Sequence, residues 1–326
     1  MRLVIALGGN ALARRSEPIS AEVQRANTKR AVTALAPLIG ATNQVVITHG
    51  NGPQVGMLAL QAAAGPRDGA YPLDMLGAES EGLIGYLIEQ ELRNALPTSS
   101  LTAVILTQTL VDAADPAFSK PTKPVGPVYS RQDAERLAKE RGWHVAPDGQ
   151  HYRRVVASPA PKSILEAGVI ELLVNHGVTV ICAGGGGIPV VEVRDGVLLG
   201  IEAVIDKDAA SVLLARKLNA DRLILLTDVD AAYLDWGKPE ARAIKRAHPS
   251  MMDLKTFPAG SMRPKIEAAM DFATGTGKPA SIGALENVVT VLAGTSGTTI
   301  DTACLLLELY PAGVIAHPHL RLSTTD

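Results

Sequence analysis

Short apolar segments recur along the chain and alternate with stretches of helical spacing. The apolar segments are typical of buried strands, because they lack the strict polar alternation of a sheet with one solvated face. Seven segments are predicted to be strands, at residues 3–7, 44–48, 101–107, 178–183, 221–227, 279–282 and 297–300. With helices between them, they indicate one large α/β unit or two α/β lobes.

Helices are predicted at residues 21–35, 73–92, 131–141 and 209–218, and another opens within residues 260–265. The third has local signals at both ends, since Ser130 and Asp133 form a capping box and Gly142 supplies the stop. Asp208 is expected to be the N-cap of the fourth, and Pro264 suits the first turn of the fifth. The glycines within residues 73–92 indicate close helix packing rather than chemistry.

The composition is that of an ordinary globular protein of 326 residues, with 47% hydrophobic and 20% charged residues. A net charge of −2 gives no basic patch for nucleic acid, and 3% aromatic residues leave few platforms for stacking bases. No apolar run reaches the roughly 18 residues of a membrane-spanning helix, and no signal peptide is recognisable. Cys182 and Cys304 lie far apart, which disfavours a disulfide framework or thiolate metal site and fits a reducing cytoplasm.

The first two predicted strands both end in glycines next to an asparagine. These residues are Gly8, Gly9 and Asn10 after the first strand, and Gly50, Asn51 and Gly52 after the second. Glycine lets backbone N–H groups approach a ligand closely, although one such end alone is also explained by a sharp turn. Two equivalent strand ends can line one crevice. His49 is interpreted as structural, because neither a nucleophile nor a metal ligand is near it in the sequence.

Two lysines are predicted at helix N-termini, where the helix macrodipole disfavours a cation. Lys207 stands just ahead of helix 209–218, and Lys265 lies in the first turn of the next helix. The strand before Lys207 ends in four glycines, residues 184–187. Backbone amides and cations in this arrangement suit a phosphate, which would relieve the unfavourable field. The alternative for Lys207 is a surface lysine beside a flexible loop.

Residues 111–162 differ in composition from the rest of the chain, since they contain seven of its 21 prolines. We interpret this segment as a small lid inserted between strands, because long excursions of this kind are usually functional. Lys123 sits in a stiff proline-rich turn that could aim a cation into the crevice. A rigid solvent-exposed linker is the alternative.

Other short motifs give weaker signals. Asp228 follows the strand at 221–227, where it could meet a metal or a ribose or simply form a turn. Residues 275–278 resemble part of a Walker A loop but lack its first glycine and its Ser/Thr, and residues 184–187 do not complete a dinucleotide fingerprint. No metal site built by the protein is expected. A phosphate site would therefore be assembled from several strand ends.

Taken in order, these motifs resemble those of carbamate kinases, in the amino-acid kinase superfamily. The matching segments are residues 6–12, 48–56, 121–127, 153–159, 183–189, 205–208, 226–230 and 260–265. The glycine-asparagine strand ends are features of the wider superfamily. The Thr-Lys-Pro segment of the lid and the Arg-Arg-Val-Val segment point to carbamate kinase in particular.

The resemblance implies a three-layer αβα sandwich with an open, mainly parallel sheet of about eight strands, a small protruding subdomain and a homodimer. It implies reversible phosphoryl transfer between carbamoyl phosphate and ADP, giving ATP and carbamate, with Mg2+ carried by the nucleotide. Carbamate then breaks down to ammonia and CO2, typically in arginine or other carbamoyl phosphate catabolism. The kinase domain would span residues 1–300, with a substrate lobe at about 1–210 and a nucleotide lobe at about 211–300; residues 301–326 form a tail of unassigned role.

The resemblance also implies roles for individual residues. Lys207 and Lys265 would neutralise charge on the transferring group, Asp208 would orient them, and Lys123 would reach the carbamate, although Lys120 is close enough to be confused with it. The two glycine-asparagine ends would hold the carbamate and the phosphoryl group. The residues expected along the nucleotide are Asp228, Tyr233, Gly260 and Met262.

The chain departs from the family pattern at a few positions. Glu79 and Glu81 stand where many members carry Met and Gln, and Arg263 replaces a small residue beside the expected nucleotide site. These departures bear on substrate detail. Competing hypotheses are a superfamily member with another acceptor, such as an amino-acid carboxylate or a nucleoside monophosphate, and a non-catalytic binding protein.

Overall fold

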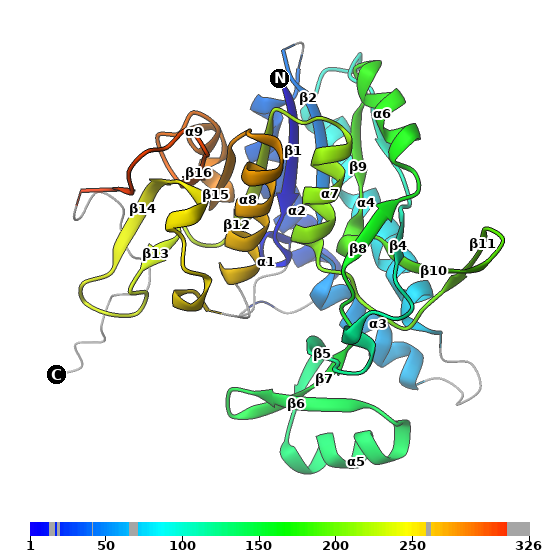
Figure 1. The fold of residues 1–326 in the computed structure, drawn as a ribbon. Helices are drawn as coiled ribbons and strands as arrows, with labels where there is room; N and C mark the ends of the chain where they lie inside the picture. Colours follow the sequence, from blue (N-terminus) through cyan, green and yellow to red (C-terminus); the bar gives the residue numbers. More distant parts are fainter. Residues whose placement is uncertain (13–16, 18–19, 41, 65–70, 259–261, 312–326) are drawn as a thin grey trace.

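The computed structural model describes residues 1–326 except 13–16, 18–19, 41, 65–70, 259–261 and 312–326. Its largest sheet has ten strands among the described residues, in the order β13-β14-β16-β15-β12-β1-β2-β9-β3, with β17 paired to β14 (Figure 1). The strands are β1 (Arg2–Leu7), β2 (Gln44–His49), β3 (Thr102–Val104), β9 (Thr179–Cys182), β12 (Arg222–Thr227), β13 (Tyr233–Leu234), β14 (Arg242–Ala247), β15 (Ala280–Ala284), β16 (Thr298–Ile300) and β17 (Glu308–Leu309).

The middle of this sheet is parallel, as the sequence indicates. Strand β1 pairs in parallel with β2 and β12, β2 and β3 pair in parallel with β9, and β12 pairs in parallel with β15. Antiparallel pairing enters only towards one end, where β15 meets β16 and β14 meets β13 and β17. The carboxyl ends of β12, β1, β2 and β9 therefore lie side by side at one edge.

Helices cover both faces of the sheet. Alternate side chains of β1 enter two separate cores: Val4 and Ala6 belong to one, and Leu3, Ile5 and Leu7 to the other. The helices of the first face are α6 (Ala167–Asn175), α7 (Lys207–Lys217) and α8 (Met262–Thr276), and those of the second are α2 (Ala21–Leu35), α4 (Leu73–Ala95) and α9 (Val288–Leu292). The three-layer αβα prediction is confirmed, with two more strands in the sheet than expected.

Two smaller sheets extend from the sandwich. One has the order β11-β10-β4-β8, and the other, β5-β7-β6, protrudes from the main body together with α5 (Figure 1). Their elements are β4 (Gln108–Val111), β8 (Pro161–Ile164), β10 (Ile188–Arg194), β11 (Val197–Gly200), β5 (Lys123–Tyr129), β6 (His144–Asp148), β7 (His151–Val156) and α5 (Arg131–Arg141). The protruding subdomain was expected. The β10–β11 hairpin was not, because its outer part, the end of β10 and all of β11, is exposed and gives no core pattern.

Local signals place some boundaries well. Ser130 Oγ accepts a hydrogen bond from the Asp133 N–H at 3.1 Å, and Gly142 ends α5 with φ 66°. Within α4, Gly85 packs closely, since a Cβ there would lie 2.6 Å from Val104 Cγ1; Gly77 meets nothing within 4 Å. Close packing therefore explains one of these glycines and not the other. None of the helices in the described part combines the length and apolar character needed to cross a bilayer.

Candidate active site

The two glycine-asparagine strand ends meet at the carboxyl edge of the sheet. The Gly50 N–H donates to the Leu7 carbonyl at 3.0 Å, and the Gly8 N–H donates to the Leu226 carbonyl at 3.1 Å. A Cβ on Gly50 would lie 3.0 Å from the Gly9 nitrogen, so a side chain there would press into the neighbouring turn. The backbones of β1 and β2 can approach this closely because both turns carry glycine.

The glycines after β9 form a third wall, which we call the glycine turn (residues 183–187). A Cβ on Gly185 would lie 2.2 Å from Nδ2 of Asn51, a side chain that is only 6% exposed. The Asn51 amide donates to Ser80 Oγ at 2.8 Å. Gly52 is the first residue of α3 (Gly52–Ala64). The turn and the second strand end are thus in direct contact, as a site assembled from several strand ends requires.

A carboxylate shared by two lysines lies at this edge. Asp208 Oδ1 accepts from Lys207 Nζ at 2.5 Å, and Oδ2 accepts from Lys265 Nζ at 2.9 Å. The side chains of Asp208, Lys207 and Lys265 are 5%, 11% and 13% exposed. The two lysines come from the first turns of α7 and α8, which pack against each other. The structure therefore brings together two lysines that lie 58 positions apart in the chain, at 207 and 265.

The predicted N-cap of α7 was wrong. The helix begins at Lys207, and its N-cap is Asp206, whose Oδ1 accepts from the N–H groups of Asp208 at 2.9 Å and Ala209 at 3.2 Å. Both acids are good capping residues, and local sequence does not choose between them. Because Asp206 supplies the cap, the carboxylate of Asp208 is left to bind the two lysines.

Burial and charge act in opposite directions on these groups. Burial alone would raise the pKa of Asp208, but the positive charges of Lys207 and Lys265 hold it well below its usual range. Burial lowers the pKa of Lys207, and Asp208 only partly opposes the effect. For Lys265, burial also favours the neutral amine, but Asp208, together with the charges of Asp206 and Asp228, outweighs it and raises the pKa. The Asp208 carboxylate is thus the group that keeps buried positive charge at the site.

Lys123 reaches the same helix terminus from the protruding subdomain. It lies at the start of β5, and its Nζ donates to Asp206 Oδ2 at 2.7 Å, with both side chains about a third exposed. Three ammonium groups therefore share the carboxylates of Asp206 and Asp208. Lys120, the alternative lid lysine, is exposed.

The residues expected along the nucleotide do not form one cluster as the lysines and Asp208 do. Asp228 follows β12, accepts from Thr227 Oγ1 at 3.1 Å, and its charge contributes to raising the pKa of Lys265. Tyr233 is 4% exposed, donates its hydroxyl to Asp230 Oδ1 at 2.8 Å and packs edge-on against Trp236. Met262 opens α8 and packs against the core. Gly260 and the Asn10 side chain lie outside the described residues.

Several buried polar residues around the site were given no part in it by the sequence analysis. Thr48 Oγ1 and Ser211 Oγ are 2.7 Å apart, and Ser211 donates to the Lys207 carbonyl at 2.7 Å, which ties β2 to the first turn of α7. His49 is fully buried, and burial lowers its pKa to about 4, so its imidazole is neutral. Glu81 is 1% exposed. Its position three residues before Ile84 puts it on the buried face of α4, a signal available in the sequence.

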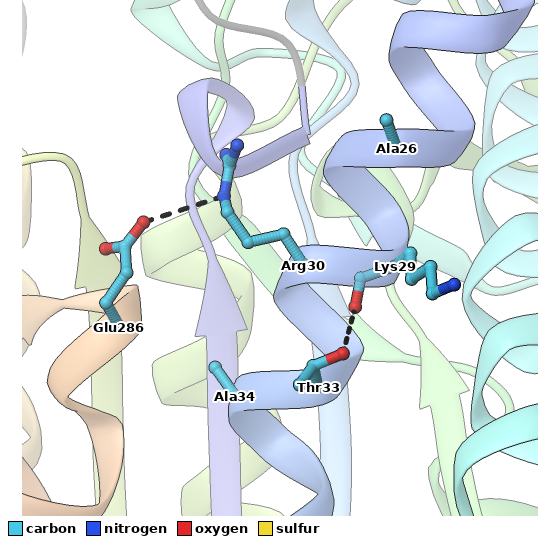
Figure 2. Close-up of a pocket in the computed structure, with 6 residues that line it drawn as sticks. All are labelled: Ala26, Lys29, Arg30, Thr33, Ala34 and Glu286. Carbon is cyan, nitrogen blue, oxygen red and sulfur yellow. Dashed lines mark hydrogen bonds and ion pairs between the residues drawn. The ribbon is translucent and has the colours of Figure 1, made fainter.

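A separate surface hollow of about 490 Å³ lies on the other face of the sheet. Its lining comes from α2 and the short 3-10 helix before α9 (Leu285–Asn287) and consists of Ala26, Lys29, Arg30, Thr33, Ala34 and Glu286 (Figure 2). Arg30 Nε and Glu286 Oε1 approach to 3.6 Å across it. The hollow contains none of the predicted site residues, because α7 and α8 pack on the opposite face.

Asp208→Asn should destabilise the protein far more than Asp206→Asn. The first change leaves two buried ammonium groups without their shared anion, which should lower the free energy of unfolding by about 3 kcal/mol or more. The second keeps an oxygen that caps α7 and loses one partly exposed ion pair, which should cost less than about 1 kcal/mol. Urea unfolding at neutral pH measures both. Equal losses would mean that Asp208 does not anchor the lysines.

Comparison with known proteins agrees with this geometry. The amino acid kinase family model matches residues 1–284. The carbamate kinase of Rhizobium meliloti is 53% identical over 305 residues, which cover 93% of this chain and 94% of that protein. That of Haemophilus influenzae is 54% identical over 300 residues, covering 92% and 96%. The structure of carbamate kinase from Giardia lamblia bound to AMP-PNP has a TM-score of 0.82 and 40% identity, covering 92% of this chain and 98% of that one. The chain belongs to the carbamate kinases of the amino acid kinase family.

Proposed function

We propose that the chain catalyses reversible phosphoryl transfer between carbamoyl phosphate and ADP, giving ATP and carbamate. The observation that carries the proposal is the pair of buried ammonium groups on Asp208, beside three glycine-bearing strand ends. An anion with several oxygens would satisfy the amides and ammonium groups together. The relatives with about half of their residues identical to this chain are carbamate kinases, which supports the choice of substrates.

In the proposed reaction an oxygen of the ADP β-phosphate attacks the phosphorus of carbamoyl phosphate. The bond from phosphorus to the carbamate oxygen breaks, and carbamate leaves with its electron pair. Such a transfer needs little covalent chemistry from the protein, so positioning and electrostatics dominate. Lys207 and Lys265 would stabilise charge on the moving phosphoryl group, and Asp208 would hold both Nζ atoms in place. The turns at Gly8 to Asn10 and Gly50 to Gly52 would bind the carbamate and phosphoryl oxygens.

The nucleotide would lie towards the β12 side of the site. Asp228, Tyr233, Met262 and Gly260 are proposed to lie along it, with residues 1–210 serving the substrate and 211–300 the nucleotide. Mg2+ is proposed to arrive on the nucleotide phosphates, where it would neutralise phosphate charge. This fits the chemistry of the ion, because Mg2+ often binds through substrate phosphates and waters together with one or two carboxylates.

The protruding subdomain is proposed to act as a lid. Lys123 is assigned as its substrate-binding lysine rather than Lys120, because Lys123 already contacts the carboxylate next to the Lys207 ammonium. The carbamate group would take the place of part of that contact. Residues 111–162 would thus add a third cation to the site from outside the sandwich.

We also propose a homodimer, formed around the free edge of β3. This strand ends the main sheet, and large apolar side chains are exposed on the elements around it. They are Met75, Leu83 and Tyr86 of α4, Leu101 and Leu106 beside β3, and Val169 and Leu172 of α6. An exposed edge strand with apolar neighbours favours pairing with a second copy.

A cytoplasmic location is also proposed, since Cys182 and Cys304 are both free thiols.

The proposed reaction is tested by ATP formation from carbamoyl phosphate and ADP. The purified chain should produce ATP, and it should not turn over acetylglutamate, glutamate or UMP with ATP at a comparable rate. Turnover of one of those acceptors without carbamoyl phosphate activity would establish another kinase of the same fold. Nucleotide binding with no turnover of any substrate would instead support a binding protein.

Lys207→Ala and Lys265→Ala should each lower kcat by about 10²–10³-fold, because a charge-stabilising group contributes mainly in the transition state. The affinity for ADP, measured by calorimetry, should change far less. Lys217→Ala is the matched control, because Lys217 lies exposed at the other end of α7. Unchanged turnover in either variant would remove that lysine from the proposed mechanism.

Sedimentation velocity should give about twice the chain mass of 34.1 kDa. Leu106→Glu should shift the protein towards monomer, because it places a charge among the apolar residues around β3. Leu305→Glu should leave the mass unchanged, although Leu305 is 85% exposed, because it lies beyond β16 at the opposite end of the sheet. A monomeric wild-type protein would contradict the proposal.

A further inference from the structure

The glycine turn adopts a conformation that needs outside support. Ala183 has φ 50°, and Gly185, Gly186 and Gly187 have φ 66°, 94° and 89°. The left-handed region is unfavourable for alanine by roughly 1–2 kcal/mol. Within the turn, the Gly186 N–H donates to the Ala183 carbonyl at 3.1 Å and the Gly187 N–H to the Gly184 carbonyl at 3.0 Å, but these bonds do not attach the turn to the rest of the site. The turn also borders the proposed phosphoryl site through the contact of Gly185 with Asn51. Its position therefore depends on the side chains that bind its backbone.

Two threonines hold the two sides of the turn. The Ala183 N–H donates to Thr107 Oγ1 at 2.9 Å, and Thr109 Oγ1 donates to the Gly186 carbonyl at 2.9 Å. Both threonines are fully buried. The N–H of Gly184, which lies between these two contacts, is bound by a third side chain.

That side chain is Glu81 of α4. Its Oε1 accepts from the Gly184 N–H at 2.8 Å, and its Oε2 accepts from the Thr107 N–H at 3.3 Å. The preceding residue, Ser80, accepts the hydrogen bond from Asn51. Two consecutive residues of one helix thus fix two walls of the site, the glycine turn and the asparagine that it touches.

We propose that Glu81 is a positioning residue that acts in its uncharged, protonated form, holding the glycine turn against Asn51 and keeping negative charge away from the phosphoryl anion. The assignment rests on the proposed function for the identity of that anion. A glutamine at this position would present the same shape and the same lack of charge, with one oxygen left to accept a hydrogen bond.

The surroundings of Glu81 favour the neutral acid. Burial raises the pKa of Glu81 to about 8, although the hydrogen bonds from Gly184 and Thr107 oppose the shift. The titratable groups that face it are His49 on β2, Cys182 on β9 and Glu166 ahead of α6. His49 is neutral because burial lowers its pKa to about 4, and burial raises the pKa of the Cys182 thiol. None of the three supplies a positive charge that would stabilise a Glu81 carboxylate at neutral pH.

The pH dependence follows from the direction of this shift. The folded protein holds the Glu81 proton more tightly than the unfolded chain, in which the pKa is near 4.5. The resulting stabilisation is complete below about pH 4.5 and is lost as the pH rises to about 8. Above pH 8 the ionised carboxylate stands behind the Gly184 amide and should weaken the binding of an anionic substrate.

The experiment compares wild type with Glu81→Gln, Glu81→Ala and the control Glu79→Gln, which removes an exposed carboxylate from the same helix. Urea unfolding is followed between pH 5 and 9. Relative to wild type, the midpoint of Glu81→Gln should increase progressively as the pH rises to about 8 and then stay at a constant offset, while Glu79→Gln follows wild type throughout. In kinetics, the KM for carbamoyl phosphate should rise above pH 8 in wild type and Glu79→Gln, and this rise should be absent in Glu81→Gln.

Glu81→Ala leaves two buried N–H groups without an acceptor and should raise the KM for carbamoyl phosphate at neutral pH by at least about tenfold. Glutamine, whose one oxygen can accept from the Gly184 N–H, should restore part of that loss. Parallel unfolding midpoints for Glu81→Gln and wild type, together with an unchanged alkaline rise in KM, would overturn the proposal. If the wild type turns over no carbamoyl phosphate, the proposed function fails, and the unfolding comparison still decides whether Glu81 is uncharged in the fold.

Discussion

The site depends on one carboxylate that is held between two buried ammonium groups. Burial alone would favour the neutral forms of Lys207 and Lys265, and the charge of Asp208 opposes this effect at both. Each lysine lies in the first turn of its helix, where the helix macrodipole adds to the cost of a cation. Asp208 offsets that cost only in part, since its one charge is shared by two ammonium groups. The remaining positive potential is what an incoming phosphate would satisfy.

The surrounding fold supports this arrangement from several directions. The parallel strands bring four carboxyl ends to one edge, and glycine allows their turns to touch. Helix α4 fixes Asn51 through Ser80 and the glycine turn through Glu81. Lys123 arrives from a separate subdomain on Asp206. Because Asp206 caps α7 and Asp208 binds the lysines, two neighbouring acids serve different purposes. Placement and electrostatics, rather than an activated nucleophile, are therefore what this edge of the sheet provides.

Much of the fold was predictable because its signals are local. Helices α2 and α5 run between the residues expected for them, since capping and periodicity are set within a few residues. The central strands were predicted because burial on both faces gives an apolar run. Strand β11 was missed because all of its residues are exposed and serve no core in a single chain, although Val191 of its partner β10 is buried in a small cluster.

The site was only partly predictable, because its geometry depends on long-range partners. The choice between Asp206 and Asp208 as N-cap is settled by Lys265, 57 residues away from Asp208. The environment of Glu81 depends on Gly184, 103 residues away. Glycine patterns indicated that strand ends would meet, but the distances and charge states came from packing. The family motifs supplied the roles of residues whose neighbourhood in sequence carries no chemistry of its own.

The most direct measurement is a crystal structure with ADP, Mg2+ and a planar aluminium fluoride mimic of the transferring phosphoryl group. The account predicts the mimic beside the turns of β1 and β2, with Nζ of both Lys207 and Lys265 within about 3 Å of its ligand atoms and Asp208 still bound to each. A mimic held elsewhere, with both ammonium groups remaining on Asp208 alone, would contradict it.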